Sequence, residues 1–160
     1  MISVGSNIPA GNFQELTESG IDQVSTDSVF KGKKVVVFGI PGAFTPVCSE
    51  QHLPGYVKKA KQLADKGVDQ IVCMAVNDPF VMKAWGDSQN VAGKVRLLAD
   101  GNAELTKAMG LDLDASGFGM STRCHRFSMV VENGKVTKLH VQDNPLELSG
   151  AACEVILGEL

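Results

Sequence analysis

The sequence predicts an α/β protein in which helices cover both faces of a central mixed sheet. Apolar runs typical of buried strands alternate with segments of helical periodicity, and this alternation favours β-α-β units with parallel strands. Two further apolar runs, 127–132 and 136–141, flank Asn133-Gly134, a dipeptide typical of a tight β-hairpin. A chain of 160 residues is long enough to bury one sizeable core, so we expect a single domain over residues 1–160.

The expected elements follow one another with short connections. The polar, glycine-rich segment 1–34 indicates short strands or a hairpin around Gly20, followed by one helical turn capped by 25–27. Buried strands are predicted at 35–40, 69–76 and 95–99. Helices are predicted at 56–66, 79–88, 102–109 and 146–160, with a glycine-rich connection at 111–122.

Prolines and capping residues mark the starts of two helices. Asn77 or Asp78 is expected to cap the helix that begins near Pro79. Pro54 has no N–H group to donate within a helix, so it is expected to kink the preceding turn. The turn that contains Cys48 should therefore be partly separated from the rest of its helix.

Composition excludes several classes of function. The net charge of -3, without a long basic run, gives no reason to expect binding to nucleic acid or to an anionic membrane surface. No apolar stretch approaches the roughly 18 residues of a membrane span, and segment 1–20 lacks the pattern of a secretory signal. The four cysteines lack C-x-x-C spacing, so neither a zinc site nor a disulfide scaffold is indicated. We expect a reducing, cytoplasmic compartment, with a processed organelle form as the alternative.

Segment 41–48 carries the clearest chemical signal in the chain. Pro41 and Gly42 end the strand at 35–40, Thr45 is a suitable N-cap, and Pro46 suits the first helical position. Cys48 should then lie in the first turn of a helix, where unpaired N–H groups and the helix dipole favour a thiolate. The pattern therefore predicts a nucleophilic sulfur, in contrast to the small buried hydrophobe that an average cysteine forms.

Deprotonation alone does not make a cysteine an efficient catalyst. A thiol with a pKa of about 8.5 is roughly 3% ionised at pH 7, so full ionisation raises the thiolate population only about thirtyfold. The remainder must come from groups that position the substrate and stabilise charge on the leaving group. The Thr45 hydroxyl and the N–H groups of Val47 and Cys48 are candidates, and Thr45 can also serve as a plain helix cap.

Pro41, Thr45 and Cys48 form a P-x-x-x-T-x-x-C pattern that resembles the peroxiredoxins. Segments 41–49, 52–56 and 76–85 are similar to the type II subgroup, which contains peroxiredoxin five, and the similarity covers nearly the whole chain. The resemblance implies a thioredoxin-like fold and a thiol peroxidase without metal or organic cofactor. Its substrates would be hydrogen peroxide and alkyl hydroperoxides.

The resemblance also implies roles for individual residues. Cys48 would attack peroxide and become sulfenic acid, Pro41 would shield the sulfur, and Gly42 and Val47 would help bind the substrate. In type II peroxiredoxins an arginine immediately precedes the aromatic residue that opens the late strand, which selects Arg126 as the catalytic cation.

Arg123 and two histidines receive other roles. Arg123 and His125 are expected at the surface or behind the site. His52 follows Cys48 by one helical turn, and we expect it to pack or to hydrogen-bond near the site without acting as the general base. His140 is expected to be structural.

The remaining cysteines leave open how Cys48 is regenerated. Some plant-like type II members have a second cysteine at the spacing of Cys73 and are proposed to use it as the resolving partner; a buried strand cysteine is the alternative. Cys153 does not match the resolving position of the animal-type relatives, and Cys124 receives no role.

The expected partners follow from the same resemblance. The reductant would be glutaredoxin with glutathione, or thioredoxin, and a homodimer would form through the regions of Phe44, Phe80 and Trp85, unless these are core residues. A peroxide sensor or redox-regulated holdase that uses Cys48 is the alternative function. A disulfide reductase is disfavoured because a C-x-x-C pair is absent.

Overall fold

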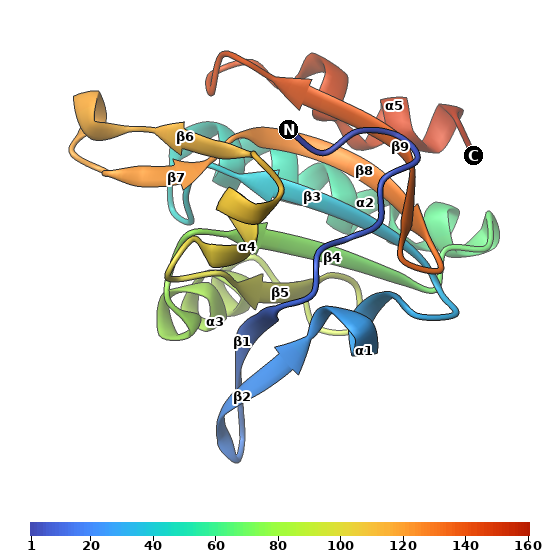
Figure 1. Ribbon diagram of the computed structural model, residues 1–160, viewed down its shortest axis with the longest axis horizontal. Helices are drawn as coiled ribbons and strands as arrows, with labels where there is room; N and C mark the ends of the chain where they lie inside the picture. Colours follow the sequence, from blue (N-terminus) through green and yellow to red (C-terminus); the bar gives the residue numbers. More distant parts are fainter.

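The computed structural model describes residues 1–160 and contains a seven-stranded mixed sheet with helices on both faces (Figure 1). In order across the sheet, the strands are β2 (Gly20–Ser25), β1 (Asn12–Thr17), β5 (Arg96–Ala99), β4 (Gln70–Ala75), β3 (Lys34–Ile40), β8 (Arg126–Glu132) and β9 (Lys135–Gln142). Strands β3, β4 and β5 are parallel, whereas the other pairs are antiparallel. The predicted mixed sheet is confirmed.

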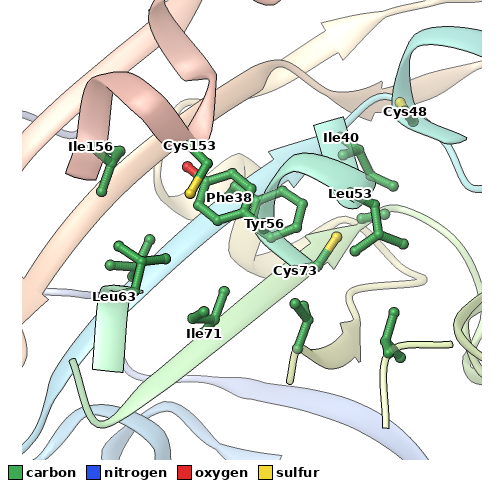
Figure 2. Packing of buried hydrophobic residues seen from close by; sticks show 14 of the residues in the cluster. Phe38, Ile40, Cys48, Leu53, Tyr56, Leu63, Ile71, Cys73, Cys153 and Ile156 are labelled. Atoms are coloured by element: carbon green, nitrogen blue, oxygen red, sulfur yellow. The ribbon is translucent and has the colours of Figure 1, made fainter. Parts of the chain in front are cut away.

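Strand β3 lies at the centre of the sheet, between β4 and β8. Its residues after Lys34 are buried, as the apolar run predicts. Because successive side chains of a strand point to opposite faces, Val35 and Val37 enter one core while Val36 and Phe38 enter the other. Figure 2 shows the second of these cores, in which Phe38 stacks on Tyr56 with ring centroids 4.1 Å apart.

Helices close both cores. Helices α2 (Leu53–Asp65), α3 (Pro79–Ser88) and α5 (Cys153–Gly158) contribute side chains to the core that contains Phe38. Helices α1 (Thr26–Phe30) and α4 (Glu104–Ala108) contribute to the opposite core. None of the helices combines the length and the apolar character that crossing a membrane requires.

The predicted turns and caps near the N-terminus agree with the structure. Strands β1 and β2 form the expected hairpin, and the Ser25 hydroxyl accepts a hydrogen bond from the Ser28 N–H group at 3.1 Å to cap α1. Of the two candidate caps of α3, Asp78 is the one used, because its carboxylate accepts from the Val81 N–H group at 2.8 Å.

Two predictions about local structure are wrong. Segment 111–122 is not a plain connection, because β6 (Asp112–Asp114) pairs with β7 (Thr122–Cys124) around the short 3-10 helix η2 (Ser116–Phe118). These three-residue strands are too short to show an alternating pattern.

The predicted C-terminal helix at 146–160 is also wrong in its first half. In the structure, segment 146–160 contains the 3-10 helix η3 (Ser149–Ala151) followed by the short helix α5. The Ala151 carbonyl accepts hydrogen bonds from the side chains of His52, Tyr56 and Ser128, so tertiary donors replace the helical N–H group that it would otherwise bind.

A glycine in β3 is required by the packing of the neighbouring strand. A Cβ atom at Gly39 would overlap the ring of Phe127 in β8, whereas a Cβ atom at Gly55 in α2 would meet no atom within 4 Å. We expect Gly39→Ala to lower the free energy of unfolding by about 1–3 kcal/mol through overpacking. Gly55→Ala should raise it by roughly 0.5–1 kcal/mol through helix propensity. Urea denaturation checks both values, and a Gly39→Ala protein as stable as the wild type would contradict the packing argument.

Candidate active site

Cys48 lies where the chain leaves the central strand and begins a helix. After Ile40 the chain turns, and helical structure begins at Pro46. Residues Cys48–His52 form a π-helical turn, η1, in which the Leu53 N–H group donates to the Cys48 carbonyl. Because Pro54 has no N–H group, the regular helical ladder cannot continue unbroken across this point. The Cys48 turn is nevertheless continuous with α2 and differs from it in its π-helical hydrogen bonding.

The guanidinium of Arg126 meets the Cys48 sulfur. Arg126 opens β8 and is only 1% exposed, and its Nη2 atom donates to Cys48 Sγ at 3.2 Å. Its Nε and Nη2 atoms also donate to the Pro145 carbonyl, at 3.2 and 3.0 Å. No carboxylate forms an ion pair with Arg126. Arg126 is therefore a buried cation without an anionic partner, and the Cys48 sulfur is one of the atoms to which it donates.

His52 holds the other side of the guanidinium. Arg126 Nη1 donates to His52 Nδ1 at 2.9 Å, and His52 Nε2 donates to the Ala151 carbonyl at 3.0 Å. Burial, and then the nearby charge of Arg126, lower the pKa of His52 from its ordinary value of 6.5 to about 3. His52 is therefore neutral at physiological pH. Since both of its ring nitrogens are occupied, it orients Arg126 and has no free lone pair for a substrate proton.

Thr45 stands on the turn before the helix. Its hydroxyl donates to the Gly42 carbonyl at 2.6 Å, and its carbonyl accepts from the Ser49 N–H group at 2.9 Å. No backbone N–H group donates to the hydroxyl, so the expected side-chain cap is wrong. The tight turn gives the hydroxyl a nearer acceptor, and its own acceptor positions stay available to a substrate.

A small, mainly apolar pocket lies beside the residues that surround Cys48, while Cys48 itself is fully buried and does not line it. Its volume is about 170 Å³, and the predicted site residues Pro41, Thr45, Val47 and Arg126 line it. The remaining lining residues are Pro46, Leu113, Ala115, Phe118, Met120, Pro145 and Leu146. Six of the 11 lining residues come from the β6–β7 region and from the chain after β9, and no sequence pattern connects these segments with Cys48.

Gly42 does not line this pocket. It is buried behind it, and a Cβ atom there would lie 3.0 Å from Nη1 of Arg123 and 3.2 Å from Cγ2 of Thr45. A side chain at Gly42 would therefore require Arg123 and Thr45 to shift slightly. Arg123 packs behind the turn, and its Nε donates to the Met120 carbonyl at 2.9 Å.

The chain is similar to known proteins over nearly its full length. A family model described as Redoxin matches residues 3–153. The sequence is 44% identical to peroxiredoxin-2D of Arabidopsis thaliana, over 99% of this chain and 98% of that protein. It is 46% identical to peroxiredoxin-2C of Oryza sativa subsp. japonica, over 94% of each chain.

The chain belongs to the peroxiredoxin family.

Solved structures support the same assignment. Reduced Prx3 of Vibrio vulnificus, crystallised in complex with hydrogen peroxide, superposes with a TM-score of 0.94 at 47% identity, covering 99% of each chain. Peroxiredoxin 5 from Alvinella pompejana gives a TM-score of 0.84 at 32% identity, covering both chains fully. The thioredoxin-like fold and the type II resemblance are thereby confirmed, and this peroxiredoxin is a thiol peroxidase.

The other cysteines of this peroxiredoxin are buried free thiols. Cys73 pairs with Phe38 across β3 and β4, and burial, followed by the proximity of Cys48 and Cys124, raises the pKa of its thiol well above the ordinary value. Burial also raises the pKa of Cys153, to about 12. In Figure 2 the Cys73 thiol lies among the apolar side chains near Tyr56 and Leu53. None of these three thiols faces the pocket.

Two contacts near Cys48 were not anticipated from the sequence. Trp85 of α3 is fully buried, and its Nε1 atom donates to the Ser49 hydroxyl at 3.0 Å, which joins η1 to α3. Asn77, considered only as a helix cap, accepts a hydrogen bond from the Ala43 N–H group at 2.9 Å. The position of Asn77 at the end of a strand parallel to β3 was the available signal, because the carboxyl ends of parallel strands meet at one edge.

The buried His52 makes stability depend on pH. The unfolded chain binds a proton at His52 near pH 6.5, whereas the folded protein resists it down to about pH 3. Stability should therefore be retained above pH 6.5 and lost as the pH falls below it, by about 1.4 kcal/mol per pH unit. Between pH 6.5 and 5 we expect urea denaturation to show a loss about 2 kcal/mol greater for the wild type than for His52→Gln. Identical pH dependence of the two proteins would contradict a buried neutral His52.

Proposed function

We propose that Cys48 is the peroxidatic residue and reduces hydrogen peroxide and alkyl hydroperoxides. The Cys48 thiolate attacks the terminal oxygen, so that an S–O bond forms as the O–O bond breaks. Cys48 is oxidised to sulfenic acid, and the leaving oxygen takes up a proton and departs as water or an alcohol. The observation that carries this proposal is the buried Arg126 guanidinium, which has no carboxylate partner and lies 3.2 Å from Sγ.

The residues around Cys48 have separate roles in the reaction. Arg126 stabilises the thiolate and the negative charge that develops on the leaving oxygen. The Thr45 hydroxyl, whose acceptor positions are open, accepts a hydrogen bond from the peroxide O–H group and so orients the O–O bond along the line of attack. Pro41 and Val47 exclude water beside the sulfur. The apolar wall with Phe118 and Leu146 accommodates the carbon chain of an alkyl hydroperoxide.

Regeneration of Cys48 requires an external reductant. Glutaredoxin with glutathione, or thioredoxin, would supply the electrons, and a Cys48–Cys73 disulfide would be one route to them. Both thiols are fully buried, on a π-helical turn and inside a strand. Formation of the disulfide would therefore require the Cys48 turn to unwind first. Direct attack of an external thiol on the sulfenic acid would require less unwinding of the Cys48 turn than the Cys48–Cys73 disulfide does.

Assembly and location are further parts of the proposal. Phe44 and Phe80 are each 58% exposed, which is unusual for aromatic side chains, and both lie near the starts of helices beside the site. We assign them to a homodimer interface, whereas Trp85 is a core residue. The enzyme would act in the cytoplasm; relatives named mitochondrial and chloroplastic leave an organelle form as the alternative.

Replacement of the two arginines tests the proposed site. Arg126→Gln should slow the reaction of Cys48 with hydrogen peroxide by about 10²–10³-fold, the cost of losing one preorganised donor. Arg123→Gln, the matched control on the neighbouring strand, should change it less than about threefold. Stopped-flow measurement of Trp85 fluorescence after mixing with peroxide gives both rates, and Cys48→Ser defines the zero. Peroxide turnover by Cys48→Ser would sink the proposal.

Peptide mapping after one equivalent of peroxide tests the resolving step. If Cys73 resolves Cys48, the oxidised wild type should contain a Cys48–Cys73 disulfide, and hydrogen exchange should rise in 45–53 because the turn has unwound. Sulfenic acid or a glutathione adduct on Cys48 with Cys73 still free would make this a one-cysteine enzyme. Steady-state turnover with glutaredoxin or thioredoxin separates a peroxidase from a sensor, which would be oxidised but not recycled.

A further inference from the structure

The residues Gly42, Ala43, Phe44 and Thr45 form a tight turn, here called the active-site turn, that sets the position of the Thr45 hydroxyl. The Thr45 N–H group donates to the Gly42 carbonyl at 3.4 Å, and the hydroxyl donates to the same carbonyl at 2.6 Å. The Thr45 carbonyl accepts the first hydrogen bond of the helix, from the Ser49 N–H group. A change in the shape of the turn therefore moves the Thr45 hydroxyl.

Phe44 holds an unfavourable backbone conformation within this turn. Its φ is 64°, in the left-handed region, and among the non-glycine residues with positive φ it is the only aromatic one. Turns of this shape usually carry glycine or asparagine at the third position, because a Cβ atom there costs of order 1–2 kcal/mol. The Phe44 side chain is 58% exposed, so its own packing offers little compensation within the chain.

Asn77 supplies a contact that opposes relaxation of the turn. Its Oδ1 atom accepts from the Ala43 N–H group at 2.9 Å, and Ala43 directly precedes Phe44. Asn77 lies in the connection between β4 and α3, whose helix the next residue, Asp78, caps. Asn77 is therefore held by a neighbouring, well-anchored element. If this bond were lost, Phe44 could rotate to a right-handed conformation and carry Thr45 away.

We infer that Asn77 is a positioning residue for peroxide reduction, because it holds the active-site turn in the strained shape that presents Thr45. This inference rests on the proposed role of Thr45 beside Cys48. Asn77 touches neither Cys48 nor Arg126 through a hydrogen bond, so its effect reaches the reaction only through the turn. Loss of Asn77 should thus impair substrate orientation while leaving the reactivity of the sulfur itself in place.

A double-mutant cycle between Asn77 and Phe44 tests the inference. Asn77→Ala should lower the rate constant for oxidation of Cys48 by hydrogen peroxide about tenfold, equivalent to about 1.4 kcal/mol. In a Phe44→Gly background, where the turn shape carries no steric cost, the same substitution should lower the rate less than about twofold. Comparing within each background removes any effect of Phe44→Gly on assembly. Asp87→Ala, which removes an exposed ion pair with Lys83 on α3, is the control and should leave the rate unchanged.

The rate at which iodoacetamide alkylates Cys48 distinguishes a specific effect on the turn from a general loss of structure, because a general loss of structure would change this rate. This reaction needs a reactive thiolate but no oriented peroxide, so its rate should be the same for the wild type and Asn77→Ala. Equal peroxide rates for those two proteins, or the same loss in both Phe44 backgrounds, would overturn the role of Asn77. A wild type whose Cys48 does not react with peroxide at all would instead overturn the proposed peroxidatic site.

Discussion

A buried guanidinium without a carboxylate partner is the constraint on which this active site depends. Arg126 is removed from water, and neutral acceptors meet it on two sides: the Pro145 carbonyl and the Nδ1 atom of His52. These dipoles satisfy its donors but do not cancel its charge. The guanidinium also donates to Cys48 Sγ, so an uncompensated positive charge lies directly beside the sulfur. A carboxylate at the position of His52 would form an ion pair with Arg126 and compensate its charge.

The sheet brings the necessary groups together at one edge. Strand β3 ends at Ile40 and leads to Cys48, while the antiparallel neighbour β8 begins with Arg126 at the same edge. The chain after β9 then returns past this edge, so that the carbonyls of Pro145 and Ala151 reach Arg126 and His52 (Figure 1). The same return interrupts the C-terminal helix, because the Ala151 carbonyl is used by side chains of the site.

Different residues determine the charge beside the Cys48 sulfur and the position of the Thr45 hydroxyl. The charge beside the sulfur depends on Arg126, His52 and the C-terminal return, whereas the Thr45 hydroxyl depends on the active-site turn and on Asn77 from the other side of β3. The π-helical turn that contains Cys48 joins the two supports, and the Trp85–Ser49 hydrogen bond anchors it to α3. Since Pro54 already breaks the helical ladder there, this turn needs few broken hydrogen bonds to open for a reductant.

The order of strands and helices, the hairpin at Asn133-Gly134 and the burial of β3 follow from the sequence alone, because periodicity and turn chemistry are local properties. Pro41, Thr45 and Cys48 were chosen from a sequence pattern, and Arg126 from the resemblance to type II peroxiredoxins. The structure places Pro41, Thr45 and Arg126 around one pocket and Arg126 against the Cys48 sulfur. Tertiary structure alone decided the rest. The partners of His52, the contact of Asn77 with the turn, the β6–β7 wall of the pocket and the break in the C-terminal helix all join segments distant in the chain. Such contacts satisfy buried donors and acceptors in three dimensions, and no local propensity records where their partners lie.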